Sequence, residues 1–349
     1  MMNLFIRLYR KGEQNVKQFN KIIIMTFIIG IFISNNYCQE KLAQTGFNFL
    51  EVSTDARSSG MAEAVNSISG YSDALFHNPA SMAEITNFMT ATFSFNKWIA
   101  DINHLSASVI LAPSSGDYGV VGFSLQSVDY GEVEWTEVAD NDLGYIDMGI
   151  IKPIAICMGF GYAKSLSDKF SVGAQVKYAY QSLGSSRIPE LERDSITGYK
   201  LKKNETDAIA VDFGTLYKTG IKSLAFGMSI RNYSSEVKYA EEGFQLPLLF
   251  TIGISADVFD FVDISGPEQS LLLSIDATHP RARAEQLKIG LEYKFMEVLA
   301  LRGGYIAGND EDDFTFGFGL TKYGFGVDYS YTPFGIFDNV QRFSARISL

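Results

Sequence analysis

Apolar and polar residues alternate with a period of two along most of the chain after residue 89. The clearest segment is 314–321, in which three phenylalanines and a leucine are interleaved with threonine and glycine. Similar segments lie at 170–180, 287–295 and 343–349. Because successive strand residues point to opposite faces, each segment predicts a β-strand with one apolar face and one polar or small face.

The alternation predicts fourteen strands, an even number, as in bacterial outer-membrane barrels. Their apolar faces extend over about 9–11 residues, the length that a tilted strand needs to cross a bilayer, and aromatic residues gather near the strand ends. The predicted strands span 90–99, 102–112, 118–127, 148–164, 170–182, 208–217, 223–233, 248–258, 270–278, 285–295, 298–306, 313–322, 323–331 and 342–349. We therefore expect an all-β fold, a 14-stranded antiparallel transmembrane β-barrel.

The lengths of the connections support the barrel over a soluble β-sandwich, whose strands also alternate. Every second connection is short, apart from a longer one at 259–269. The other set is long and polar, apart from a tight first hairpin at 100–101, and its longest members are 128–147, 183–207, 234–247 and 332–341. A barrel with both ends in the periplasm separates its connections in this way, and a sandwich has no reason to.

The first 38 residues have the basic, apolar, polar order of a secretory signal peptide. The apolar run at 22–33 is shorter than the ~20 residues of a membrane-spanning helix, so a membrane anchor is the weaker interpretation. We place cleavage near Cys38–Gln39, and no later segment is apolar for long enough to form such a helix. The expected organisation is a signal peptide at 1–38, an N-terminal plug segment at 39–88 and a barrel at 89–349.

Composition and charge narrow the possible functions. The chain has 27 Phe, 18 Tyr and 31 Gly, a combination that suits a barrel with aromatic residues toward lipid and glycine inside. The formal charge is −11, and removal of the leader, with five Lys or Arg and one Glu, leaves 24 − 39 = −15. So acidic a protein is not expected to bind nucleic acid, because phosphate binding requires a basic surface.

Charged residues of both signs occupy the faces that the alternation turns inward. They are Lys177, Asp212, Arg231, Asp276, Glu292, Arg302, Asp328 and Arg342. Small residues such as Gly159, Gly227 and Gly317 share these faces and would let a backbone approach the wall from inside. Mixed charges and small residues favour a lumen filled by protein over an open pore.

Residues 39–87 do not alternate but carry a recognisable motif, TGFNFLEVSTDARSSGMAEA at 45–64 and YSDALFHNPASMA at 71–83. This segment resembles the PorV/PorQ family of outer-membrane proteins, relatives of the long-chain fatty-acid transporter FadL. The residues that carry the resemblance are Asp55, Arg57, Gly60, Asn78, Pro79 and Ala80. Ser81-Met82-Ala83 stands where relatives often have Gly-Leu. The resemblance implies that the segment lies inside a fourteen-stranded barrel, where Asp55 and Arg57 would pair with lumenal charges as a gate or as plain ion pairs.

No catalytic, cofactor or metal site is expected. The three histidines, His77, His104 and His279, lack metal-ligand spacing, and we interpret His77 as a packing residue. There is no Gly-x-Ser-x-Gly elbow to support a hydrolase. The acidic run at 309–313 contains ligands suited to calcium but lacks the spacing of a dedicated loop, which favours a solvated hairpin.

Three functions follow. The resemblance implies a non-enzymatic type IX secretion component that docks or shuttles secreted substrates in the outer membrane of a Gram-negative bacterium. Its partners would be outer-membrane lipid and either translocon subunits or the C-terminal domains of secreted cargo. The loops 128–147 and 183–207, with Trp135 and Tyr199, would then be the contact surfaces. The alternatives are a FadL-like channel for fatty acids or other hydrophobic solutes and a structural barrel with no transport role.

Overall fold

The computed structural model describes residues 45–192, 195–239, 242–262, 269–308, 314–335 and 339–349. The predicted signal peptide at 1–38 and the acidic run at 309–313 lie outside the described residues. Among the described residues, no helix is long and apolar enough to span a membrane.

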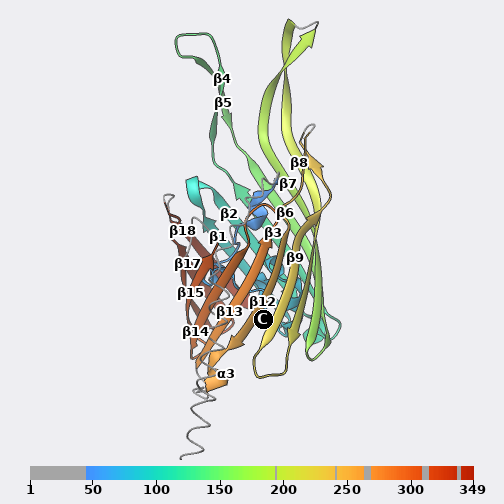
Figure 1. Cartoon of the computed structure of the whole chain (residues 1–349), viewed down its shortest axis with the longest axis vertical. Helices are drawn as coiled ribbons and strands as arrows, with labels where there is room; N and C mark the ends of the chain where they lie inside the picture. The colour runs from blue at the N-terminus through green and yellow to red at the C-terminus, as the bar shows by residue number, and fades with distance from the viewer. Residues whose placement is uncertain (1–44, 193–194, 240–241, 263–268, 309–313, 336–338) are drawn as a thin grey trace, which may run out of the picture. The chain divides into compact units, whose positions relative to one another are not determined.

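Fourteen antiparallel strands close into a barrel (Figure 1). The first strand, β1 (Met89–Lys97), pairs with the last, β18 (Val340–Ser348), so that the sheet has no free edge within the barrel. The other barrel strands are β2 (Asn103–Leu111), β3 (Val120–Asp129), β6 (Ile154–Ser167), β7 (Phe170–Glu192), β8 (Ser195–Lys218), β9 (Ala225–Ser234), β12 (Leu249–Asp257), β13 (Gln269–Pro280), β14 (Gln286–Phe295), β15 (Leu299–Ala307), β16 (Phe314–Lys322) and β17 (Phe325–Thr332). The predicted fold class is confirmed, and each predicted strand overlaps an observed one.

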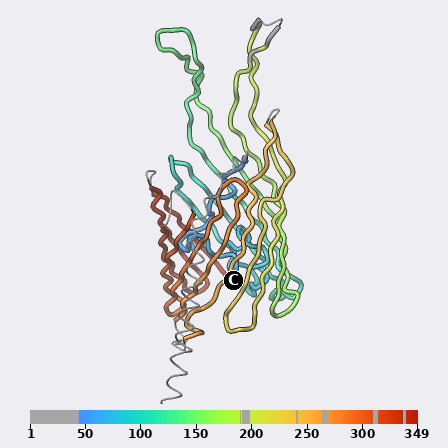
Figure 2. The backbone as a smooth tube through the Cα atoms, in the orientation of Figure 1, coloured from blue at the N-terminus to red at the C-terminus, as the bar shows by residue number. Residues whose placement is uncertain are grey.

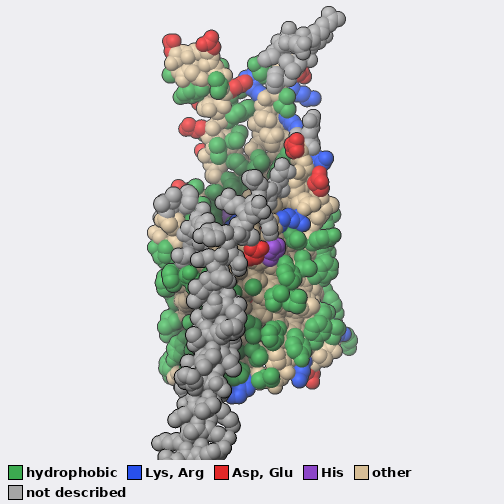
Figure 3. All heavy atoms as spheres, viewed as in Figure 1, with side chains coloured by type: hydrophobic (Ala, Val, Ile, Leu, Met, Phe, Trp, Pro, Cys, Tyr) green, Lys and Arg blue, Asp and Glu red, His purple; other side chains and the backbone are tan. Residues whose placement is uncertain are grey.

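The alternation separates a lipid-type face from a lumenal face, as expected. In β1, Phe93 and Phe95 are exposed, whereas Thr92, Ser94 and Asn96 are buried. Figure 3 shows hydrophobic side chains covering the visible barrel wall, with charged side chains gathered toward its ends and on the projecting hairpins. The outward aromatic rows therefore form an apolar band, which is what a β-barrel presents to lipid.

The two longest predicted loops are extended strands. β7 and β8 continue past the barrel and stay paired to Glu192↔Ser195, and β4 (Val133–Val138) pairs with β5 (Tyr145–Ile151) in a separate two-stranded sheet. Figure 1 shows both hairpins projecting from the same end of the barrel, which we call the hairpin end. A shorter pair in the next long connection is formed by β10 (Val237–Lys238) and β11 (Gly243–Phe244). Period-two alternation could not reveal strands whose two faces are both exposed.

The opposite end, which we call the turn end, carries the short connections. Two of these contain a helical turn: η5 (Pro113–Gly116) follows β2, and α3 (Val258–Val262) follows β12. At the hairpin end, η4 (Ile99–Asp101) forms the tight first hairpin.

Residues 45–88 form short helical turns inside the barrel, and we call this segment the plug (Figure 2). Its elements are η1 (Asn48–Glu51), α2 (Ala56–Gly60), η2 (Ser72–Phe76) and η3 (Pro79–Glu84). Hydrogen bonds tie it to separate strands of the wall: the Ala56 amide donates to Ser344 Oγ of β18 at 2.9 Å, and the Asn66 amide donates to an Asp276 carboxylate oxygen of β13 at 2.8 Å.

Glycines of the wall allow the plug backbone to approach closely. A Cβ on Gly304 would lie 2.4 Å from the backbone nitrogen of Ala62, and a Cβ on Gly227 would lie 2.2 Å from the carbonyl oxygen of Asn66. Such distances are shorter than any non-bonded contact, so only glycine fits at these two positions while the plug keeps its place.

Candidate functional site

A buried ion-pair network joins the plug to the wall. Arg57 of α2 binds Glu292 of β14 through two parallel hydrogen bonds, Nη2–Oε1 at 2.9 Å and Nε–Oε2 at 3.0 Å. Glu292 is fully buried and also accepts from Arg302 Nε at 2.7 Å, and Arg302 in turn donates to Asp328 at 2.7 Å. Paired charges of this kind are tolerated inside a protein because each partner satisfies the other.

Two further charges adjoin this network. Lys294 lies 3.3 Å from Glu292, and Arg346 lies 3.3 Å from Asp328. We call the six residues the charge ladder: Arg57, Glu292, Lys294, Arg302, Asp328 and Arg346. Lys294 and Arg346 were not among the predicted lumenal charges, although both share the inward parity of Glu292 and Arg342 on their strands.

Asp55 connects the two motif segments of the plug. It caps α2 by accepting from the Ser58 amide at 2.8 Å, and it lies 3.3 Å from His77 Nε2. Burial by itself would raise the pKa of Asp55, but the hydrogen bond and charge of His77, together with Ser58, hold that pKa at about 2. His77 therefore has a polar partner and is more than the packing residue that we predicted.

The Asn-Pro-Ala triplet fixes the second half of the plug. Asn78 Oδ1 accepts from the Ala80 amide, and its Nδ2 donates to the carbonyls of Asn66 at 2.8 Å and Thr215 at 3.0 Å. Pro79 starts η3 and lies against Gly173 of β7. These motif residues therefore cap a helical turn and pack against the wall. Gly60 also packs closely against the wall, because a Cβ at this position would lie 3.1 Å from the Cα of Gly317 in β16.

The predicted lumenal charges face the interior but do not form one site. Lys177 pairs with Asp212 at 2.8 Å, and Arg231 donates to the Phe76 carbonyl. Arg342 donates to Thr332 and lies 5.4 Å from the centroid of the Trp98 ring. Asp276 accepts a hydrogen bond from the Asn66 amide, and Glu292, Arg302 and Asp328 belong to the charge ladder.

An ion pair that was not predicted from the sequence also joins the plug to the wall. It is formed by Glu63 of the plug and Lys288 of β14, at 2.7 Å.

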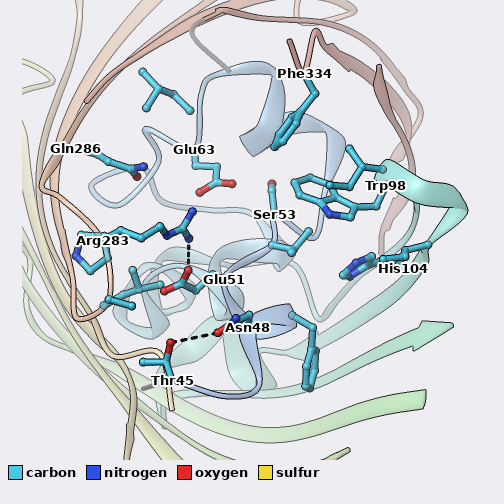
Figure 4. A pocket seen from close by; sticks show the side chains of 18 of the residues that line it. Thr45, Asn48, Glu51, Ser53, Glu63, Trp98, His104, Arg283, Gln286 and Phe334 are labelled. Carbon is cyan, nitrogen blue, oxygen red and sulfur yellow. Dashed lines mark hydrogen bonds and ion pairs between the residues drawn. The ribbon is translucent and has the colours of Figure 1, made fainter. Parts of the chain in front are cut away.

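At the hairpin end the plug forms the floor of a cavity of about 440 Å³. Figure 4 shows its two sides, with Trp98, His104 and Phe334 facing Arg283 and Gln286 across the plug residues. The ring centroids of Trp98 and Phe334 are 5.1 Å apart, an edge-to-face arrangement. Arg283 forms an ion pair with Glu51 of the plug. The cavity therefore combines an aromatic side with a charged side.

Arg187 joins the two extended hairpins. Its guanidinium lies 4.1 Å from the centroid of the Tyr199 ring and binds Glu137 of β4 at 2.8 Å. Of the two aromatic residues predicted to contact partners, Tyr199 is 49% exposed and Trp135 is half-buried. Aliphatic side chains of β4–β5 are more exposed still, with Val138 at 93% and Leu143 at 74%.

A family model described as "Type IX secretion system membrane protein PorP/SprF" matches residues 147–339, more than half of the chain. The chain belongs to this family. The match runs from β5 to the segment before β18 and leaves out the plug. Type IX secretion was the system that the sequence resemblance implied, and the narrower PorV/PorQ assignment remains a prediction beside the PorP/SprF match.

Solved structures resemble this PorP/SprF family member in fold. They include the CymD monoaromatic hydrocarbon channel (13% identity, TM-score 0.59, 85% of this chain and 98% of that chain). The toluene transporter TodX of Pseudomonas putida is similar in fold (13% identity, TM-score 0.57, 89% of this chain and 99% of that chain). So is a FadL homologue of Pseudomonas aeruginosa (12% identity, TM-score 0.53, 85% of this chain and 98% of that chain). No curated protein sequence matches the chain significantly.

The family and the fold are those of a secretion component and a channel-like barrel, rather than of a class of enzymes. Within the residues that the structure describes, no three His, Cys, Asp or Glu side chains are grouped so as to hold a metal ion.

Proposed function

We propose that this PorP/SprF family member is a non-enzymatic outer-membrane component of a type IX secretion system that docks a partner protein on its extended hairpins. Both barrel ends would lie in the periplasm, with β4–β5 and the far halves of β7–β8 outside the membrane. The partner would be a translocon subunit or the C-terminal domain of a secreted protein. The observation that carries the proposal is the pair of strand-forming hairpins beyond the barrel, which expose several apolar side chains.

The hairpins have the features of a protein-binding surface. Ile146 and Ile150 of β5 and Leu201 of β8 are exposed, although they lie beyond the barrel wall, where no lipid would cover them. Exposed apolar groups rimmed by polar ones mark interaction sites on proteins. In the described structure the β4–β5 sheet contains two strands, so its outer edges offer backbone groups to which a partner strand can add.

The filled lumen favours docking over passage through the barrel. The plug is held by the charge ladder, the Glu63–Lys288 pair and glycine contacts, and moving it would uncover several buried charges at once. Each uncompensated buried charge costs several kcal/mol. A plug held so firmly is expected to stay in place while the exposed hairpins bind.

A shortened protein tests the proposal. In one variant Asn-Gly replaces 187–201, so that Ser186 and Lys202 flank a two-residue turn, and in a second Asn-Gly replaces 135–149 between Glu134 and Ile150. We expect both barrels to fold, as judged by their migration in unheated gels, while secretion of type IX cargo falls sharply. Unchanged secretion in a protein that carries both replacements would contradict the proposal.

A FadL-like channel is the second candidate, favoured by the aromatic side of the hairpin-end cavity and by a fold shared with hydrocarbon channels. Its test is uptake of a fatty acid into liposomes that contain the purified protein. Uptake that is lost in Trp98→Ala, with secretion unaffected by the hairpin deletions, would favour the channel. No uptake and no secretion defect would leave a structural barrel.

A further inference from the structure

A second cavity, of about 410 Å³, lies at the turn end, on the other side of the plug from the first. Four cationic side chains line it: Arg57 from the plug, Lys294 from β14, Arg302 from β15 and Arg346 from β18. They are the four cations of the charge ladder, and the function proposed above makes no use of their cavity side.

The ladder contains more positive than negative charge. Its four cations share two carboxylates, because Arg57, Lys294 and Arg302 all contact Glu292, while Arg302 and Arg346 both contact Asp328. Four positive and two negative charges leave an excess of +2. Charge held in a partly enclosed lumen is costly unless a counter-charge accompanies it.

Neighbouring acids do not remove the whole excess. Glu297 lines the cavity from the exposed turn between β14 and β15 and reduces the excess to +1. Asp73 of the plug lies within electrostatic reach of Arg346 and accepts from Ser108 at 3.1 Å, but burial and the charge of Asp55 raise its pKa to about 8. With its pKa raised, Asp73 carries less negative charge near pH 7 than an ordinary carboxylate, so it compensates little.

Two of the cations keep hydrogen-bonding capacity toward the cavity. The side chain of Lys294 is 41% exposed and that of Arg346 is 18% exposed, whereas Arg302 is buried at 2%. Lysine has three donors and arginine five, and the described contacts occupy only part of them. Arg57 and Arg302 form ion pairs with Glu292 and Asp328, and their charges add to the positive potential around Lys294 and Arg346.

We propose that the turn-end cavity binds an oxyanion, a phosphate or carboxylate group, with Lys294 and Arg346 as its hydrogen-bond donors. The cavity exceeds the size of either group, so the ligand can be a larger molecule that ends in such a group. An anion here compensates the excess charge of the ladder and fastens the plug from the side opposite to the hairpins.

The test is a titration of the purified full-length protein in detergent with sodium phosphate, against sodium chloride at matched ionic strength. We expect saturable binding by calorimetry and a higher melting temperature with phosphate, and about a tenfold or greater loss of affinity in Lys294→Met. Lys322→Met is the matched control, because Lys322 is exposed at the same end but outside the cavity. Lys294→Arg, which keeps the charge, should recover most of the affinity.

A parallel titration with sodium succinate distinguishes the two sources of the oxyanion. Binding of phosphate alone assigns a phosphate group, and binding of succinate alone or of both assigns a carboxylate or general oxyanion site. The proposal is overturned if neither anion binds saturably, or if Lys294→Met and Arg346→Gln proteins that remain folded bind as well as the unmodified protein. Neither outcome depends on whether the hairpins dock a partner.

Discussion

The plug and the extended hairpins differ in which side chains are buried: charged groups are buried around the plug, whereas apolar groups are exposed on the hairpins. Between the plug and the wall, charges such as Arg57 and Glu292 are buried and paired, and wall glycines let the plug backbone approach the wall backbone closely. On the hairpins, apolar side chains such as Val138 face solvent, and an ion pair that joins the two hairpins, Arg187 with Glu137, is partly exposed. The contrast agrees with the proposal above, in which the contacts of the lumen stabilise the protein and the hairpins bind the partner.

Removal of the central carboxylate should have the largest effect. Glu292→Ala leaves Arg57, Lys294 and Arg302 without their shared partner, and we expect a loss of about 3–5 kcal/mol in the free energy of unfolding. Urea unfolding of the detergent-solubilised or lipid-reconstituted barrel measures it. Glu134→Ala on the exposed hairpin is the control and should change stability by less than about 0.5 kcal/mol. Equal effects of the two substitutions would erase the distinction between the regions.

Two adjacent glycines of β15 offer a sharper comparison within the wall. Gly304→Ala would place a Cβ 2.4 Å from the Ala62 nitrogen of the plug, whereas a Cβ on Gly303 meets no atom within 4 Å. We expect Gly304→Ala to destabilise the protein by about 1–3 kcal/mol and to increase protease access to the plug. Gly303→Ala should be nearly neutral, and a similar loss in both would show that the plug does not press on the wall.

Acid should loosen the plug through Glu63. Burial would raise the pKa of Glu63, but Lys288 overrides it and lowers that pKa from 4.5 to about 2. Because the pKa is lower in the folded state, the stabilisation is present above about pH 4.5 and is lost as pH falls toward 2. In Glu63→Gln, melting temperatures measured between pH 5 and pH 3 should fall less steeply than in the unmodified protein. Parallel profiles would contradict the contribution assigned to this pair.

The smallest effect on stability is expected where the effect on recognition is large. Arg187→Ala removes a partly exposed ion pair and a stacking contact with Tyr199, which together should contribute about 1 kcal/mol or less. It also releases the two hairpins from each other, so partner capture should weaken while the melting temperature barely changes. Lys202→Ala, on the same hairpin, serves as the control. A large fall in melting temperature with intact capture would reverse the roles of the two regions.

The features that depend on the alternation of apolar and polar residues could be predicted from the sequence, and those that depend on long-range contacts could not. Strand number and the inward charges follow from parity, because a wrong face would expose Glu292 to lipid. The outer halves of β7 and β8 were predicted as a loop, because the sequence of 183–207 does not alternate between an apolar and a polar face. The partner of Arg57 could not be derived either, because the two residues are 235 positions apart and meet only through the closure and register of the barrel.

The proposed docking function is tested most directly by capture of native partners from membranes with the tagged full chain and with the variant in which Asn-Gly replaces 187–201. We predict that the full chain recovers type IX secretion components or secreted C-terminal domains and that the shortened barrel, folded and present in equal amount, recovers far less. Equal recovery by both proteins would contradict docking on the hairpins.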